Sequence, residues 1–273
     1  MTIVIDGRKL AGIRETALKQ AVSNLRAKGM VPRLVSLVMS GDEAGLGYLK
    51  LKAAAAVRIG VELEKVVVSD WQADEVMGLI RRFNQDDKVQ GMMVQRPGVR
   101  WGEKQGMGRS EFEAWWSQVV AAIDAKKDVD GLTAKSRFLS ATVKAVGMVL
   151  EQVGVAKGRM VVVGSQGLVG RRLVEYFSDK EFKVEGVDVD ERELGRMTKK
   201  ADVLVSATGK PGLIKAEMVK KGAVVIDVGW PKGDVKFGEV KEKASVITPV
   251  PGGIGPLTVV SLLENLVEAV YSA

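Results

Sequence analysis

The sequence has 273 residues, a formal net charge of +7, and neither cysteine nor histidine. This length suits one large or two modest domains, and 46% hydrophobic residues suffice for a sizeable core. Without cysteine and histidine, the chain has no disulfide, no thiol nucleophile, no His/Cys zinc site and no Ser-His-Asp triad, so proton transfer near neutral pH falls to Lys, Tyr, Asp or Glu.

The basic residues are scattered among acidic ones and form no arginine-rich arm. This pattern favours an anionic small-molecule substrate, or plain solubility, over nucleic acid as the reason for the charge. The sequence has no run of about 18 apolar residues that would predict a membrane span. Its first residues have neither a basic start nor an apolar signal core. We therefore expect a soluble, cytoplasmic protein with no metal, nucleic-acid or membrane partner.

In the first half of the chain, apolar segments alternate with amphipathic ones. The predicted strands are 2–5, 33–39, 63–68 and 89–95, and the predicted helices are 8–28, 48–59, 74–83 and 111–123. Residues 97–109 are polar and rich in glycine, which predicts a loop. Helices that alternate with buried strands indicate a parallel sheet.

The second half centres on a strand at 161–163, a turn containing Gly164, Gly167 and Gly170, and a helix at 168–177. Such a unit lets the backbone approach a pyrophosphate at a helix N-terminus, although a structural strand-to-helix turn has the same pattern. The other predicted elements are helices at 141–153, 215–221 and 256–270 and strands at 183–188, 203–206 and 223–228.

Tyr48 and Lys52 are four residues apart and therefore share a helix face. Leu51, Ala55, Ala56 and Ile59 are predicted on or beside that face, and Lys50 points away from it. A lysine in an apolar stripe is partly desolvated, which lowers its pKa toward the range of a general acid or base. The alternative is a lysine whose amino group reaches solvent past a packed helix.

One polar residue stands at a position where ligands bind in open α/β sheets, and a second lies in a turn-like motif. Gln95 ends a predicted parallel strand, where a loop backbone could equally satisfy it. Asp130 lies in Asp-Val-Asp-Gly, a pattern that also signals a simple turn. The segment 249–256 has too many prolines and glycines for regular structure and predicts a rigid loop.

Five stretches resemble one family. They are Tyr48-Leu-Lys-Leu-Lys-Ala53, Val94-Gln-Arg-Pro97, Lys127-Asp-Val-Asp-Gly131, Gly209-Lys-Pro-Gly212 and Ile247-Thr-Pro-Val-Pro-Gly-Gly-Ile-Gly-Pro-Leu-Thr258. Together they are similar to the bifunctional methylenetetrahydrofolate dehydrogenase/cyclohydrolase family. The resemblance implies a homodimer of α/β chains, each with a folate-binding domain that has a parallel sheet and a Rossmann-type dinucleotide domain, and an active site in the cleft between them. The expected domains are 1–141, joined by the final helix 256–273, and 142–255.

The resemblance also implies the chemistry. The enzyme would oxidise 5,10-methylenetetrahydrofolate with NAD or NADP and hydrolyse the methenyl product to 10-formyltetrahydrofolate, within one-carbon metabolism that feeds purine biosynthesis. Lys52 would be the general acid/base, Gln95 would hydrogen-bond it, Asp130 would hold the pterin ring and Tyr48 would contact the folate. Asp128 would be structural. The net positive charge of the chain would help to hold polyglutamylated folate.

The resemblance assigns further residues to the two ligands. Folate contacts are expected from Tyr48, Lys52, Val94, Gln95, Asp130, Pro251, Gly252, Gly253 and Gly255. Cofactor contacts are expected from Gly164, Ser165, Gln166, Val169, Gly170, Asp188, Asp190, Thr208, Gly209 and Trp230.

The sequence departs from the family at the cofactor site. Ser165 stands where the family has an arginine, and Asp188 and Asp190 follow the glycine turn by about 20 residues, where an acid binds the ribose hydroxyls of NAD. NAD is therefore the favoured cofactor, although both acids could instead start a turn and cap a helix. The rival hypotheses are another two-domain dehydrogenase, of the shikimate type, and a non-catalytic folate or nucleotide sensor.

Overall fold

The computed structural model describes residues 1–69, 71–189 and 193–272 and divides into two compact units. The first unit contains residues 1–12 and 142–261, and the second contains 13–141 and 262–273. Two helices run from one unit into the other along the chain: α1 (Gly7–Ala27) and α10 (Ile254–Tyr271). The first dozen residues thus group differently from the predicted boundary, because β1 (Ile3–Val4) pairs with β9 (Val246–Ile247).

The first unit is built on a six-stranded parallel sheet with the order β1-β9-β8-β7-β5-β6. Its remaining strands are β5 (Gly158–Val163), β6 (Phe182–Val187), β7 (Val203–Ser206) and β8 (Val224–Asp227). The strand order reverses at β5, which lies between β6 and β7. In open α/β sheets such a reversal opens a ligand crevice at the carboxyl ends of the strands.

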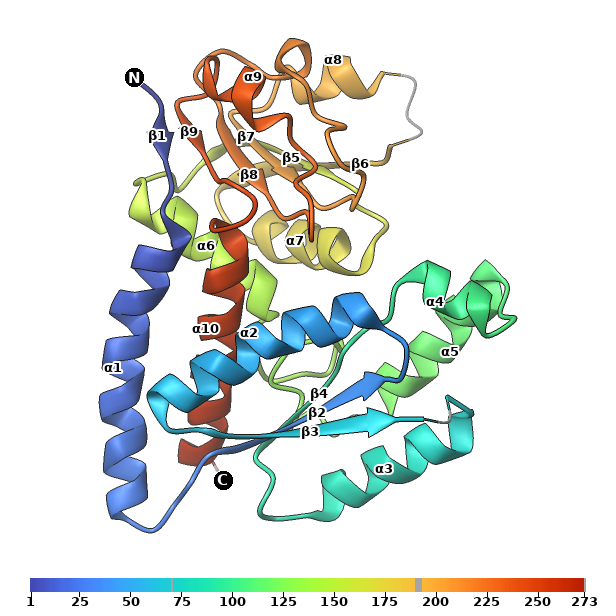
Figure 1. Ribbon diagram of the computed structural model, residues 1–273. Helices are drawn as coiled ribbons and strands as arrows, with labels where there is room; N and C mark the ends of the chain where they lie inside the picture. The colour runs from blue at the N-terminus through green and yellow to red at the C-terminus, as the bar shows by residue number, and fades with distance from the viewer. Residues whose placement is uncertain (70, 190–192, 273) are drawn as a thin grey trace. The chain divides into compact units, whose positions relative to one another are not determined.

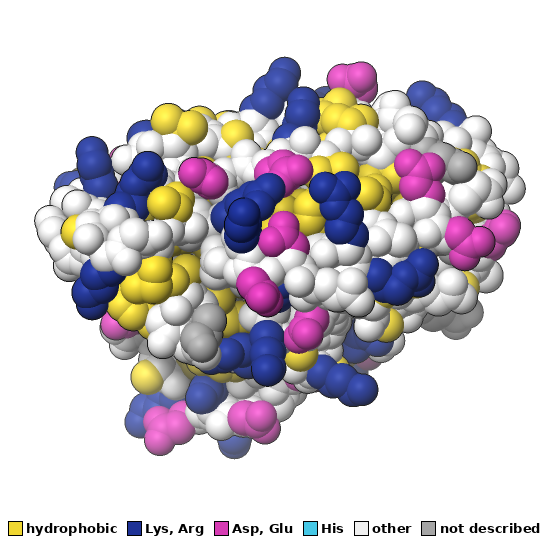
Figure 2. All heavy atoms as spheres, turned by 90° about the horizontal axis from the view of Figure 1, so that it is seen from below, with side chains coloured by type: hydrophobic (Ala, Val, Ile, Leu, Met, Phe, Trp, Pro, Cys, Tyr) yellow, Lys and Arg dark blue, Asp and Glu magenta, His cyan; other side chains and the backbone are white. Residues whose placement is uncertain are grey.

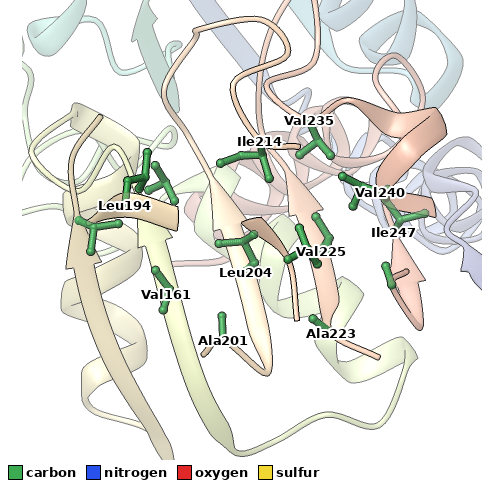
Figure 3. Packing of buried hydrophobic residues seen from close by; sticks show 14 residues of the cluster. Val161, Leu194, Ala201, Leu204, Ile214, Ala223, Val225, Val235, Val240 and Ile247 are labelled. Carbon is green, nitrogen blue, oxygen red and sulfur yellow. The ribbon is translucent and has the colours of Figure 1, made fainter. Parts of the chain in front are cut away.

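Helices and an apolar cluster complete this unit (Figures 1 and 3). The helices are α6 (Ala141–Gln152), α7 (Leu168–Ser178), α8 (Leu194–Thr198), the 3-10 turn η1 (Ala216–Met218) and α9 (Phe237–Lys241). Side chains of β5, β7 and β8 pack on one another and on residues of the loops and short helices, such as Leu194, Ile214 and Val240. This packing holds the strand ends in a fixed array.

The second unit contains a three-stranded parallel sheet with the order β3-β2-β4. The strands are β3 (Glu62–Val68), β2 (Arg33–Met39) and β4 (Gly91–Val94), and Figure 1 shows α2 (Glu43–Ile59) and α3 (Ala73–Gln85) on either side of them. Gly91 packs against Val129 and Leu266, so the end of α10 contributes to this core. The α/β prediction with parallel sheets is confirmed.

The segment predicted as a loop at 97–109 instead contains a short helix, α4 (Val99–Lys104), before α5 (Arg109–Ala121). The prediction was wrong because Gly102 here serves packing: a Cβ at this position would lie 2.7 Å from the Phe112 ring. Trp101 fixes α4 by donating its indole N–H to the Ser40 carbonyl at 2.8 Å. The short elements α8, α9 and β9 were also not predicted.

Helix α10 is long and apolar enough, by composition alone, to cross a membrane, but most of it is buried inside the protein. It therefore has the burial of a core helix. It begins at Ile254, two residues before the predicted start at Pro256, so that Gly255 lies in its first turn rather than in the preceding loop. On the face drawn in Figure 2, basic and acidic side chains are interspersed.

Candidate functional site

Helix α2 places Tyr48 and Lys52 one turn apart, as the spacing predicted. The Lys52 ammonium nitrogen lies 4.7 Å from the centroid of the Tyr48 ring, and the lysine is only 3% exposed. Ala55, Ala56 and Ile59 are buried beside it, whereas Leu51 is exposed, which corrects its predicted place on this face. Lys50 is exposed, as expected. The alternative of a lysine that reaches solvent past its helix is therefore excluded.

The end of β4 supplies the polar partner of Lys52. Lys52 Nζ lies 3.4 Å from Gln95 Oε1 and 3.5 Å from Met93 Sδ. The Gln95 backbone N–H donates to the Leu37 carbonyl at 2.8 Å, and the preceding Val94 is buried in the sheet. Gln95 is thus fixed at a strand end with its side-chain oxygen toward the lysine. Met93 was not anticipated, because nothing in a buried strand marks one methionine as a lysine neighbour.

Asp130 joins this group electrostatically. Burial lowers the pKa of the Lys52 ammonium, and the charge of Asp130 opposes that change. Burial likewise raises the pKa of the Asp130 carboxyl, which Lys52 partly offsets. Tyr48, Lys52, Gln95 and Asp130 therefore form one cluster, named here the lysine cluster, in which the lysine can lose its proton more easily than an exposed one.

Asp128 has a different task from Asp130. It is fully buried, and its carboxylate accepts hydrogen bonds from the backbone N–H of Leu132 and from both the N–H and the hydroxyl of Thr133, at 2.8–3.0 Å. These bonds shape the turn through Gly131, whose φ of +66° suits glycine. This turn fixes the position of Asp130.

In the first unit, the predicted glycine turn lies between β5 and α7. Gly164 has a φ of +85°, and a Cβ there would meet the Ala207 carbonyl oxygen at 2.6 Å. A Cβ at Gly170 would lie 2.1 Å from the Gly164 oxygen, so the first turn of α7 packs tightly on the loop. Gln166 is exposed and Val169 partly buried on this turn. Glycines that clear the backbone at the start of an 11-residue helix fit a dinucleotide pyrophosphate.

Asp188 follows β6 and folds back onto the same turn. Its carboxylate accepts a hydrogen bond from the Ser165 hydroxyl at 3.1 Å and from the Gln166 backbone N–H at 3.5 Å. Gly186 leaves room for Ser165, since a Cβ there would lie 2.7 Å from the serine Cβ. Asp190, the other predicted ribose acid, lies outside the described residues.

Thr208 and Gly209 follow β7, and Trp230, 40% exposed, follows β8. Sequence reasoning missed the buried carboxylate that holds these loops together. Asp234 accepts hydrogen bonds from the Ser206 hydroxyl at 2.9 Å and from the Thr208 N–H at 2.7 Å. Its own N–H donates to Asp227 at 3.0 Å. A glycine followed by an aspartate, as at Gly233-Asp234, is typical of a turn. The role of Asp234 in holding the two loops therefore becomes visible only in the folded chain.

The segment that precedes α10 belongs to the first unit. The Gly253 N–H donates to the Pro249 carbonyl at 2.8 Å, and the Gly252 carbonyl accepts from Gly7 N–H at 2.9 Å. A Cβ at Gly253 would lie 2.6 Å from the Pro249 oxygen, so the segment is tightly wound. Pro251 is exposed, and Gly255 has open space beside it. Of the predicted folate residues, Pro251, Gly252, Gly253 and Gly255 thus lie in a different unit from the lysine cluster.

The described residues contain no group of three or more Asp and Glu side chains that could hold a metal ion. In one unit, the carboxyl ends of the parallel strands and the glycine turn suit a nucleotide. The other unit carries the buried Lys52 with Gln95 and Asp130. Together these features define a two-domain α/β protein of the dinucleotide-binding class.

Comparison with known proteins narrows this class to one family. Residues 5–130 match the model of the tetrahydrofolate dehydrogenase/cyclohydrolase catalytic domain, and residues 140–273 match that of its NAD(P)-binding domain. The chain belongs to the tetrahydrofolate dehydrogenase/cyclohydrolase family. It is a bifunctional methylenetetrahydrofolate dehydrogenase and methenyltetrahydrofolate cyclohydrolase with a nicotinamide cofactor, as the sequence predicted.

The relatives match over nearly the whole chain. The bifunctional protein FolD of an Exiguobacterium species is 34% identical and covers 98% of both chains. The FolD structure from Campylobacter jejuni has a TM-score of 0.88 at 29% identity and covers 100% of this chain and 99% of its own. That from Trypanosoma brucei, complexed with NADP and an inhibitor, has a TM-score of 0.86 at 28% identity and covers 99% and 98%.

Shikimate dehydrogenases are only distant in comparison. The enzyme from Thermus thermophilus has a TM-score of 0.53 at 16% identity and covers 88% of this chain and 98% of its own. This likeness shows a shared fold and no more. The rival hypothesis of a shikimate-type dehydrogenase was therefore wrong.

Proposed function

We propose that Lys52 is the general acid/base of the cyclohydrolase step and that Gln95, Tyr48 and Asp130 place the folate and the lysine for it. The observation that carries the proposal is the burial of Lys52 against Tyr48 and Gln95. Burying an ammonium group is costly, and a binding protein without catalysis gains nothing from it. This argues against the sensor hypothesis.

In the proposed reaction, water attacks the methenyl carbon and a proton passes through Lys52 Nζ as the ring opens. Because burial lowers the pKa of Lys52, its neutral amine is available at lower pH than that of an exposed lysine, and it can accept that proton and return it to the leaving nitrogen. Gln95 Oε1 holds the lysine at a strand end. The Asp130 carboxyl, able to accept paired N–H donors when ionised, suits the aminopyrimidine edge of the pterin.

For the dehydrogenase step, this chain's part is orientation. The nicotinamide cofactor accepts the hydride when bound, and the pyrophosphate fits the turn of Gly164, Ser165, Gln166, Val169 and Gly170. We place the rest of the cofactor along the strand ends, against Thr208, Gly209 and Trp230. Pro251, Gly252, Gly253 and Gly255 complete the folate contacts. Holding two reactants in line supplies much of the rate of such transfers.

The first test replaces Lys52 with methionine, which keeps the length of the side chain and removes its proton. Lys52→Met is expected to lower the rate of methenyltetrahydrofolate hydrolysis about 100- to 10,000-fold, the usual loss for a general acid/base. Absorbance at the methenyl band gives the rate. The exposed Lys50→Met is the matched control and should change little. A parent-like rate in Lys52→Met would show that the assignment is wrong.

The favoured cofactor is NAD. Asp188 is tied to Ser165 and Gln166 on the glycine turn, so its carboxylate stands where the ribose is proposed to bind. An acid accepts bonds from free ribose hydroxyls and repels a 2′-phosphate. The absent arginine removes a charge-assisted bond of about 1.5–3 kcal/mol. Membership of the family does not decide between NAD and NADP. The Trypanosoma brucei relative is complexed with NADP.

The expected preference for NAD over NADP is at least about tenfold in kcat/KM, or about 1.4 kcal/mol. Steady-state rates with each cofactor at fixed folate give the ratio. Asp188→Ser should raise kcat/KM for NADP and lower it for NAD, whereas Asp179→Ser, at the end of α7, should change neither. A parent ratio in favour of NADP would overturn this part of the proposal.

The same proposal includes a homodimer that acts in the cytoplasm on folates with polyglutamate tails. The support for the tail is the net charge of +7, which favours an anionic ligand. A sedimentation experiment at micromolar concentration would determine the oligomeric state. A monomer under those conditions would remove the dimer from the proposal.

A further inference from the structure

Asp42 is a buried carboxyl group that the chemistry above does not use. It stands just before α2, the helix that carries Tyr48 and Lys52, and is 4% exposed. Its Oδ2 has no hydrogen-bond partner among the described residues. Burial raises the pKa of this carboxyl, the backbone N–H groups of Gly45 and Gly98 partly offset that, and Glu43 adds to the increase. A buried acceptor without a donor lowers the stability of the fold, so its presence calls for a functional explanation.

The surroundings of Gly45 show what Asp42 faces. A Cβ built on Gly45 would lie 2.0 Å from Asp42 Oδ2 and 2.9 Å from Gln95 Cγ. The carboxyl of Asp42 and the side chain of Gln95 therefore converge on the space that glycine leaves empty. Any other residue at position 45 would push them apart.

Gln95 has one amide group to divide between two neighbours. Its Oε1 faces the Lys52 ammonium at 3.4 Å, which directs the amide Nε2 elsewhere. The unused oxygen of Asp42 is an acceptor on the Gln95 side of Gly45. An Nε2–H bond to that oxygen would prevent the amide from turning over and placing its N–H groups against the ammonium.

We propose that Asp42 is a positioning residue: during hydrolysis of the methenyl group its Oδ2, which has no partner among the described residues of this structure, comes to accept the Gln95 amide N–H and so keeps Gln95 Oε1 on Lys52. Gly45 is part of the same device, because it lets the two side chains approach. This inference rests on the proposed roles of Lys52 and Gln95.

The test is a double-mutant cycle on methenyltetrahydrofolate hydrolysis. Asp42→Ala is expected to lower kcat about 10- to 100-fold, the cost of misplacing a catalytic group, with KM for the folate little changed. Asp42→Asn retains an acceptor oxygen and should recover most of kcat. In a Gln95→Ala background, Asp42→Ala should cause no further loss, because the group it holds is gone. The exposed neighbour Glu43→Ala is the matched control and should keep the parent rate.

Gly45→Ala supplies an independent arm that leaves the carboxyl in place. It should lower kcat in the parent and cause no further loss in the Gln95→Ala background. Thermal unfolding of each variant distinguishes a loss of folded protein from a lower rate of hydrolysis. If Asp42→Ala and Gly45→Ala each cost the same factor with and without Gln95, or cost nothing, the inference is overturned. If Gln95→Ala and Lys52→Met themselves keep the parent rate, the proposed function fails instead.

Discussion

At the scale of single residues, the environment of Lys52 links its chemistry to stability. Burial lowers the pKa of this lysine in the folded chain, while the unfolded chain keeps the ordinary value of about 10.4. Between these two values the unfolded state binds more protons, so this group makes the fold more stable as pH rises and less stable as pH falls. The residue proposed for catalysis is thus one that the fold tolerates at a cost.

The expected result is that Lys52→Met has a higher Tm than the parent near neutral pH and that the difference narrows as pH approaches about 10. Methionine is close to lysine in length and carries no charge to desolvate. Differential scanning calorimetry in a series of buffers measures the trend. Lys50→Met, exposed on the same helix, is the matched control for the loss of a lysine. A pH-independent difference for Lys52→Met would contradict the assigned direction of its pKa.

At the scale of elements, the loops after β7 and β8 depend on Asp234. Its carboxylate is fully buried and pairs with the Ser206 hydroxyl and the Thr208 N–H, while Asp227 accepts N–H bonds from Gly229, Asp234 and Val235 at 2.8–3.0 Å. One network therefore shapes both the Thr208 turn and the loop that carries Trp230.

Asp234→Ala should lower the free energy of unfolding by at least about 2 kcal/mol, since it leaves two buried donors unpaired. It should also raise KM for the nicotinamide cofactor, because Thr208 loses its anchor. Urea denaturation and steady-state kinetics check the two effects. Asp202→Ala removes an exposed pair with Lys220 and an exposed hydrogen bond from the Arg159 N–H, and it should cost no more than about 1 kcal/mol. Equal stability of the two variants would argue against the network.

The elements also show how far the sequence could be interpreted. Strands β2 and β7 were predicted to the residue, since short segments rich in Val and Leu between polar turns indicate buried strands in such a fold. The start of α2 was missed by five residues because Gly45 and Gly47 have low helix propensity. Gly45 is glycine because Asp42 and Gln95 crowd it, and that is a tertiary reason that no local pattern carries.

Some features of the candidate site could also be predicted from the sequence, and others could not. The pairing of Tyr48 with Lys52 followed from helix geometry, and the glycine turn followed from spacing. The approach of Gln95 to Lys52 came only from the family resemblance, since the two lie on segments distant in sequence. The resemblance expected Asp130 at the pterin ring, and its influence on Lys52 was not predicted. Asp42, Met93 and Asp234 were missed altogether. Each of them contacts residues distant in sequence, and such contacts become visible only when the chain is folded.

At the scale of the whole molecule, the charge of +7 predicts how the enzyme treats long folate tails. Each added glutamate brings a negative charge, so KM for the folate should fall from the mono- to the polyglutamate. The gain should shrink as salt is raised, because ions screen exposed charges. Kinetics at low and high ionic strength with both substrates measure this. Equal KM values for the two substrates at low salt would contradict the proposal.

The way the two units share the chain has a consequence for its synthesis. Strand β1 pairs with β9, whose residues are translated long after it, and Gly91 packs against Leu266 near the end of the chain. Domains usually fold as they leave the ribosome, the N-terminal one first. Here neither unit has all its parts until α10 has emerged. A nascent chain of this protein must therefore hold β1 unpaired almost to the end of translation.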